Sequence, residues 1–381
     1  MFTLIVNGEV CAPEPLGKVD LLAAFDRIAR IGDITQKEVK QLGVETNIID
    51  AKDCYVVPGF IDPHQHLLGG SGEQGFSTQT PEIDAAEIVS AGITSVVGCL
   101  GVDTTMKTMP GLLAKAKALK EEGLNAYIWS GGYHIPPRTI TDNIEDDIMF
   151  IEEVIGCGEV AISDERSTNP SALELARIVS NAHNGGMLSR KSGLTHFHVG
   201  DEDKRLEILR TLINEHQVKP EWLYPTHVMR SEELMLEAVE LAKLGAFVDM
   251  DMVDGGLRKW LNFYLENGGP IEKLTVSSDA SKTSPSNLFN EFRKCVLEDG
   301  FTIDRVLPVV TSNTAQALKL ALKGTLEPGK AADILVLNKE DLELRHVFSL
   351  GRHLFKDGKL NFKERFLKES NRVVHLEGEK A

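Results

Sequence analysis

Residues 56–66 read VVPGFIDPHQH, an apolar run that ends in two histidines separated by a single residue. An apolar run of this length followed by polar side chains is typical of a buried strand. Side chains at positions i and i+2 of a strand point to the same face, so His64 and His66 can reach one cation together. The stretch therefore predicts a strand that delivers two imidazoles to one point.

Three later apolar runs end in the same way. LTHFHVG (194–200) contains His198, WLYPTHV (222–228) contains His227, and LTVSSDA (274–280) contains Asp279. Further apolar runs alternate with helical patterns, which gives eight strand–helix pairs in succession. The expected strands are 56–62, 93–98, 126–132, 159–165, 194–200, 222–228, 247–253 and 274–280, and the expected helices are 84–92, 112–123, 145–156, 171–184, 204–216, 231–245, 257–268 and 287–300.

A repeated strand–helix pattern predicts a parallel sheet, because each helix returns the chain to the same end. Eight repeats predict an α/β fold of the TIM type, a (β/α)8 barrel whose reactive side chains project from the strand ends into one mouth. Residues 1–53 and 325–365 have a different texture, with short strands and Asn-Gly, Pro-Gly and Asp-Gly turns. We expect a small β-sandwich domain built from both chain ends, a barrel over 54–324 and a C-terminal tail over 366–381.

The composition excludes several classes of partner. The 381 residues carry a formal net charge of −16, which argues against binding to nucleic acid or to an anionic membrane surface. No apolar run approaches the roughly 20 residues that span a bilayer, and the N-terminus has no signal-peptide pattern. The cysteines number 5 and form no CxxC pair, so a disulfide framework is not expected. These features predict a cytoplasmic protein.

Four imidazoles and a carboxylate at one barrel mouth predict a metal-dependent hydrolase. This ligand set suits Zn²⁺ best, and Mn²⁺, Co²⁺ or Fe²⁺ also fit the ligand types. Two ions would need a bridging anion, for which Glu159 at the start of EVAISDE is the candidate. His196 competes with His198 as a ligand, and we favour His198 because it is nearer the strand end.

These residues resemble the amidohydrolase superfamily, whose opening and closing segments are similar to VPGFIDPHQH and GTLEPGKAADILVLN (324–338). The closer resemblance is to the isoaspartyl (β-aspartyl) dipeptidase family. It covers nearly the whole barrel and includes GGSGEQGFSTQTPE (69–82), SGGYHIPPRTIT (130–141) and AISDERS (161–167). The resemblance implies hydrolysis of β-aspartyl dipeptides by a metal-bound hydroxide.

The resemblance also implies a role for individual residues. His64 and His66 would hold one divalent ion, and His198 and His227 a second. Asp279 would ligate and act as the proton shuttle. The residues that would contact the substrate are Glu73 (its α-ammonium), Tyr133 (the developing oxyanion) and Arg166 and Arg230 (its carboxylates).

Three positions depart from the family pattern. Glu159 stands where the family has a carbamylated lysine, so no carbamylated lysine is expected; either Glu159 bridges two ions, or it fails to bridge and one ion is held weakly. Thr283 replaces a serine and keeps a hydroxyl for substrate binding, and Val102 replaces a threonine. Two structural alternatives also stay open: Glu73 as a loop ion pair, and Arg166 as a lock on Asp164.

Two other functions are compatible with the same metal ligands. A cyclic amidohydrolase, such as a dihydroorotase or hydantoinase, shares them but gives no reason for an acidic loop residue, a tyrosine and two strand-end arginines together. A catalytically inactive scaffold would be expected to lose ligands, whereas all four histidines and the aspartate are present. The family resemblance also implies a large homo-oligomer, specifically an octamer.

Overall fold

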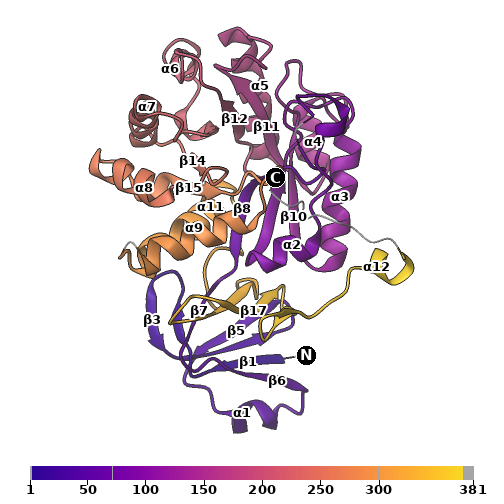
Figure 1. Ribbon diagram of the computed structural model, residues 1–381, viewed down its shortest axis with the longest axis vertical. Coiled ribbons are helices and arrows are strands. Elements are labelled where there is room, and N and C mark those ends of the chain that lie inside the picture. Colours follow the sequence, from indigo (N-terminus) through magenta and orange to yellow (C-terminus); the bar gives the residue numbers. More distant parts are fainter. Residues whose placement is uncertain (1, 71, 299, 372–381) are drawn as a thin grey trace.

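Eight strands of a computed structural model, which describes residues 2–70, 72–298 and 300–371, follow one another in a parallel ring (Figure 1). Strands β8 to β13 form one six-stranded sheet in sequence order, and β14 pairs with β15. A bridge between Gln65 and Ala280 joins the end of the ring to its beginning. The strands are β8 (Phe60–Gln65), β9 (Ile93–Gly98), β10 (Asn125–Ser130), β11 (Val154–Ile162), β12 (Thr195–Val199), β13 (Leu223–Thr226), β14 (Val248–Asp251) and β15 (Leu274–Ser277). The predicted (β/α)8 barrel is confirmed.

A helix follows each barrel strand and buries one face. In α7, for example, Leu234, Met235 and Ala238 are buried, and a fully buried aliphatic side chain contributes about 1.5–3 kcal/mol. Several of these helices begin at a side-chain cap, such as Ser231, whose hydroxyl accepts from the backbone N–H of Leu234. The barrel helices are α2 (Ala85–Ser90), α3 (Met109–Glu122), α4 (Ile144–Phe150), α5 (Ala172–Ser189), α6 (Glu207–His216), α7 (Glu232–Lys243), α8 (Leu257–Glu266) and α9 (Ser286–Leu297), followed by α10 (Ile303–Val306) and α11 (Ser312–Ala317); 3₁₀ turns are η1 (Phe76–Thr78), η2 (Pro220–Trp222), η3 (Ile271–Lys273) and η4 (Leu307–Val310).

Strands from the two chain ends form two further sheets beside the barrel, at the lower end of Figure 1. Apolar residues of both sheets, including Ile5, Leu21 and Ile334, share one buried cluster, as in a β-sandwich. The first sheet has the order β5 (Arg27–Gly32), β4 (Asp20–Ala24), β1 (Phe2–Val6), β6 (Thr46–Asp50); the second has β19 (Lys359–Leu360), β18 (Arg352–Lys356), β17 (Leu344–Ser349), β16 (Ile334–Asn338), β7 (Cys54–Pro58), β2 (Glu9–Cys11), β3 (Pro15–Lys18). The remaining helices are α1 (Gln36–Gln41) and α12 (Arg365–Glu369).

The structure corrects the first expected strand. The run 56–62 is not one strand, because Cys54–Pro58 pairs with β16 and β2 in the terminal sheet and the barrel strand starts at Phe60. Only Gly59 separates the two, and a Cβ there would lie 2.2 Å from Oγ1 of Thr94. The predicted domain limits stay a prediction. Cys54–Pro58, which we expected to belong to the barrel, pairs instead with strands of the terminal sheets.

The expected helix 145–156 was also too long. Helix α4 ends at Phe150, and β11 already begins at Val154. The apolar spacing of this segment suits a helix, but the carbonyl of Glu153 accepts from the N–H of Ile128 and so starts the pairing with β10. Tertiary pairing thus outweighs local periodicity here. Of the predicted tail, residues 372–381 lie outside the described residues; within the described ones, no helix is long and apolar enough to cross a bilayer.

Candidate active site

The four predicted histidine ligands and Asp279 lie at the carboxyl ends of barrel strands. His64 is in β8 with His66 directly after it, His198 is in β12, and His227 directly follows β13. His227 and Asp279 have φ angles of 63° and 46°. A left-handed backbone costs a non-glycine residue roughly 1–2 kcal/mol, and such conformations gather at functional sites. The strand ends thus turn sharply where these side chains meet.

Glu159 reaches the same place from inside β11 rather than from its start. Between Cys157 and Val160 the strand carries one residue more than the facing stretch of β12, which is a β-bulge. Gly158 makes the bulge possible: its φ is +145°, and a Cβ there would lie 2.6 Å from Cβ of His196. This bulge brings the Glu159 carboxylate into the mouth.

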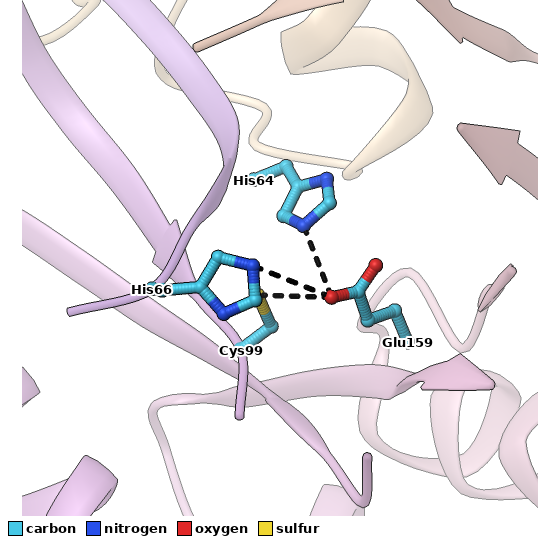
Figure 2. Close-up of side chains that lie close together, drawn as sticks. All are labelled: His64, His66, Cys99 and Glu159. Atoms are coloured by element: carbon cyan, nitrogen blue, oxygen red, sulfur yellow. Dashed lines mark hydrogen bonds and ion pairs between the residues drawn. The ribbon is translucent and has the colours of Figure 1, made fainter. Parts of the chain in front are cut away.

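The two oxygens of Glu159 face different histidine pairs. Oε1 lies 3.3 Å from Nε2 of His64 and 3.5 Å from Nε2 of His66 (Figure 2). Oε2 lies 3.4 Å from Nδ1 of His198 and 3.8 Å from Nε2 of His227. The carboxylate is completely buried. Each oxygen is therefore placed to share a cation with one pair, as a bridging ligand would be.

The donor set fits divalent cations. Both ring nitrogens of His64, Oε2 of Glu159 and Oδ1 of Asp279 are buried without a hydrogen-bond partner in the described structure. Buried polar groups without partners are costly, and a cation at this place would engage Nε2 of His64 and the two carboxylates that face it. Nitrogen and oxygen donors of this kind suit zinc and related ions. The site residues thus fit the metal ions that the sequence predicted.

Opposite charges dominate the site electrostatics. Burial lowers the pKa of His64, but the charge of Glu159 outweighs it and leaves this pKa well above the usual value. Burial also lowers the pKa of His227, but the Asp251 carboxylate outweighs this effect and raises the pKa to about 9. Burial alone would raise the pKa of Asp279. The neighbouring histidines have the opposite and larger effect, so this pKa is well below its usual value. The carboxylates stay ionised, and a metal must displace imidazole protons.

Two carboxylates contact the ring nitrogens of His227 and His198 that face away from Glu159. Oδ2 of Asp251 lies 2.8 Å from Nδ1 of His227, and Oδ2 of Asp164 lies 2.9 Å from Nε2 of His198. In both cases the other ring nitrogen faces Glu159. Metal-binding histidines are commonly held in this way, which fixes the ring and its tautomer. The orienting role of Asp251 was missed from the sequence, although it ends a barrel strand.

The predicted substrate-binding residues line one cavity next to the metal ligands. The hydroxyl of Tyr133 lies 2.7 Å from Nδ1 of His198, in hydrogen-bond contact. Oγ1 of Thr283 is buried without a hydrogen-bond partner among the described residues. Sequence reasoning missed Lys107, whose ammonium donates to the carbonyl of Leu68 at 2.6 Å. The cavity is lined by His66, Glu73, Val102, Asp103, Lys107, Tyr133, Arg166, His198, Arg230, Asp279, Lys282 and Thr283, among others.

Both arginines form ion pairs at the cavity. Arg166 donates to both oxygens of Asp164, at 2.8 and 2.7 Å, and to Oε1 of Glu73 at 2.9 Å. Arg230 donates to Oδ2 of Asp201 at 3.0 Å. The ion pair of Glu73 and the contact of Arg166 with Asp164, which the sequence left open as structural alternatives, are therefore both present. These contacts also keep the charged groups of Glu73 and Arg166 at the cavity.

His196 lies outside the clusters of possible metal ligands that the described residues form, in agreement with the preference for His198, whereas Cys99, which the sequence did not single out, lies inside one. His196 stacks on Trp129 with ring centroids 5.1 Å apart, and its Nδ1 lies 3.0 Å from the carbonyl of Tyr224. Among the described residues it belongs to no cluster of possible metal ligands. Cys99 does belong to one, with His64, His66 and Glu159. It follows β9 directly, so its strand-end position was the signal that could have found it.

Comparison with known proteins identifies relatives over nearly the whole chain. A model of the amidohydrolase family matches residues 55–360. The crystal structure of β-aspartyl dipeptidase from Fervidobacterium islandicum AW-1 is 38% identical, covers 96% of this chain and 100% of that chain, and superposes with a TM-score of 0.91. A second structure of that enzyme, in complex with a β-Asp-Leu dipeptide, is 36% identical with the same coverage and a TM-score of 0.89.

A more distant curated relative is an adenine deaminase from Clostridium perfringens, 24% identical over 345 residues, which are 86% of this chain and 54% of the deaminase. The chain thus spans about half the length of that relative. The family match, the barrel and its strand-end ligands agree with one another. The chain belongs to the amidohydrolase family and, within it, to the β-aspartyl dipeptidases.

Proposed function

We propose that this protein is a metal-dependent dipeptidase that hydrolyses β-aspartyl (isoaspartyl) dipeptides. The observation that carries the proposal is one cavity in which Glu73, Arg166 and Arg230 stand beside the cluster of possible metal ligands. The proposal is also supported by the similarity of this chain to a β-aspartyl dipeptidase whose crystal structure contains β-Asp-Leu.

The charges of the cavity match those of the proposed substrate. A β-aspartyl dipeptide carries one α-ammonium and two carboxylates, so its recognition needs one anion and two cations. Glu73 supplies the anion, while Arg166 and Arg230 supply the cations. Guanidinium groups pair carboxylates bidentately. Because Arg166 donates to Oε1 of Glu73 at 2.9 Å, we propose that substrate takes over part of this ion pair on binding.

We propose that two divalent ions, preferably Zn²⁺, are held on either side of Glu159. His64 and His66 would hold one of them, and His198 and His227 the other, with Asp279 beside the first pair at 3.0 Å from Nε2 of His66. Ions so placed supply Lewis acidity and lower the pKa of water to about 7. Glu159 needs no carbon dioxide to become a bridge, unlike a carbamylated lysine.

Asp279 and Tyr133 have complementary proton roles in this proposal. Asp279 stays ionised, and its Oδ1 faces Nε2 of His66 at 3.0 Å and Nε2 of His64 at 3.4 Å. A carboxylate held beside the metal ligands can accept a proton from the attacking water and return it to the leaving amine. Burial, reinforced by the charge of Glu159, raises the pKa of Tyr133 well above its usual value. Tyr133 therefore keeps its proton at neutral pH and can donate a hydrogen bond to the developing oxyanion.

The decisive experiment compares hydrolysis of β-Asp-Leu, α-Asp-Leu, dihydroorotate and hydantoin by the zinc-reconstituted protein. We expect turnover of β-Asp-Leu with strong preference over α-Asp-Leu. Preferential hydrolysis of a cyclic amide would instead assign the cyclic amidohydrolase function, and no turnover of any substrate by metal-loaded protein would indicate an inactive scaffold. The cytoplasmic location and the homo-octamer stay predictions, which fractionation and sedimentation would test.

A further inference from the structure

Cys99 is the one cysteine among the described residues that reaches the metal cluster. It directly follows β9 and is 1% exposed. Its Sγ lies 3.9 Å from Oε1 of Glu159 and 3.9 Å from Nε2 of His66. In Figure 2 the sulfur lies behind the His66 ring, on the same side of Glu159 as His64 and His66.

These separations match the edges of a coordination tetrahedron. Zinc bonds of about 2.0–2.1 Å to nitrogen or oxygen and about 2.3 Å to sulfur place ligand atoms about 3.3–3.6 Å apart. Oε1 of Glu159 is 3.3 Å from Nε2 of His64 and 3.5 Å from Nε2 of His66, and the two sulfur edges are 3.9 Å. These four of the six edges are within a few tenths of an ångström of the expected values.

A second observation points to a ligand at this place. Both ring nitrogens of His64 are buried without a hydrogen-bond partner in the described structure, and His64 itself is completely buried. The backbone after Cys99 also approaches closely: Gly101 has a φ of +74°, and a Cβ there would lie 2.7 Å from Cε1 of His66. The chain therefore passes close against the cluster just after Cys99.

We propose that Cys99, as a thiolate, is a further protein ligand of the ion held by His64, His66 and Glu159, in addition to Asp279, whose Oδ1 lies 3.0 Å from Nε2 of His66. This rests on the proposed metal dependence and deepens it. Binding of the ion displaces the thiol proton to solvent. The two sites would then differ in kind: the site of His64 and His66 would include a sulfur ligand, whereas the site of Glu159, His198 and His227 would have three protein ligands and keep a position for water or substrate.

The competing explanation is a thiol with a purely structural role, since the Cys99 thiol can donate to the carbonyl of Gln65 at 3.5 Å. X-ray absorption of the wild-type zinc protein separates the two without any variant. We expect a sulfur scatterer about 2.3 Å from zinc, and a shell of nitrogen and oxygen alone would overturn the proposal.

Cobalt substitution identifies the cysteine. Apo-protein titrated with Co²⁺ should develop a near-ultraviolet thiolate-to-cobalt charge-transfer band in the wild type and in the control Cys54→Ser, whose cysteine lies in the terminal sheet. Cys99→Ser should lose this band while the second equivalent still binds. A band that survives in Cys99→Ser would refute the assignment. Because neither measurement uses a dipeptide, failure of the proposed substrate would leave this result unaffected.

Discussion

Replacing Glu159 with glutamine keeps the size of the side chain and removes its charge. The carboxylate now places Oε1 within 3.3–3.5 Å of one histidine pair and Oε2 within 3.4–3.8 Å of the other. A glutamine offers one acceptor oxygen and an amino group that cannot ligate a cation. One of the two sites must therefore lose its anionic ligand, whichever way the amide is turned.

The expected effect is large. Groups that merely support a metal site alter metal affinity by roughly 10–100-fold, so loss of a direct, buried ligand should cost at least about 100-fold at one site. Metal ions contribute several kcal/mol to transition-state stabilisation, and each 1.36 kcal/mol is about tenfold in rate. We expect kcat/KM for β-Asp-Leu to fall by at least about 100-fold, together with the loss of one equivalent of bound metal.

The assay is metal content per chain after dialysis against buffered zinc, read beside β-Asp-Leu turnover. Glu153→Gln is the matched control, because Glu153 is also buried but pairs with Lys117 and Lys120 away from the mouth. That variant should keep its metal content. Two full equivalents and near-normal turnover in Glu159→Gln would refute the bridging role.

Four other predictions follow from the same geometry. Asp279→Ala should lower kcat by about 10²–10⁴-fold, the usual contribution of a general acid–base group, and near-wild-type single-turnover rates would exclude the shuttle role. Glu73→Gln should raise KM for β-Asp-Leu by roughly 10–100-fold through loss of a charge-assisted hydrogen bond and reduce preference over α-Asp-Leu; unchanged selectivity would mean that the contact is misassigned. Gly158→Ala should lower both the melting temperature and metal content, because its Cβ would meet His196 at 2.6 Å, whereas unaltered calorimetry would contradict the bulge. Since the pKa of His227 is raised to about 9, its proton competes with metal below that pH, so apparent zinc affinity should rise by up to about tenfold per pH unit between pH 7 and 9; a flat calorimetric profile would contradict this.

Much of the candidate site could be predicted because the carboxyl ends of all the strands of a barrel lie at the mouth where functional residues gather. His64, His66, His198 and His227 each end an apolar run, and parallel strands bring such ends to one mouth. The sequence also named Glu159 as the candidate bridge. It could not place Glu159 within β11, because the preceding apolar residues suit a helix and the bulge becomes visible only when β11 is paired with β12.

The residues that the sequence did not reveal are recognised only by the side chains that they contact in three dimensions. Asp251 matters because it faces the ring of His227, and nothing in FVDMDMV distinguishes it from Asp249, which is buried among hydroxyl groups instead. Cys99 was passed over because a cysteine outside a CxxC pair resembles an ordinary buried thiol. The terminal sheet gained β7 because a single glycine separates two strands of different sheets.

Anomalous diffraction at the zinc absorption edge, from crystals grown with zinc, tests most directly whether Glu159 joins two ions. Two peaks are expected, one between Oε1 of Glu159 and the pair His64 and His66, and the other between Oε2 and the pair His198 and His227. A single peak, with the Glu159 carboxylate turned away from one of the histidine pairs, would contradict the bridged centre.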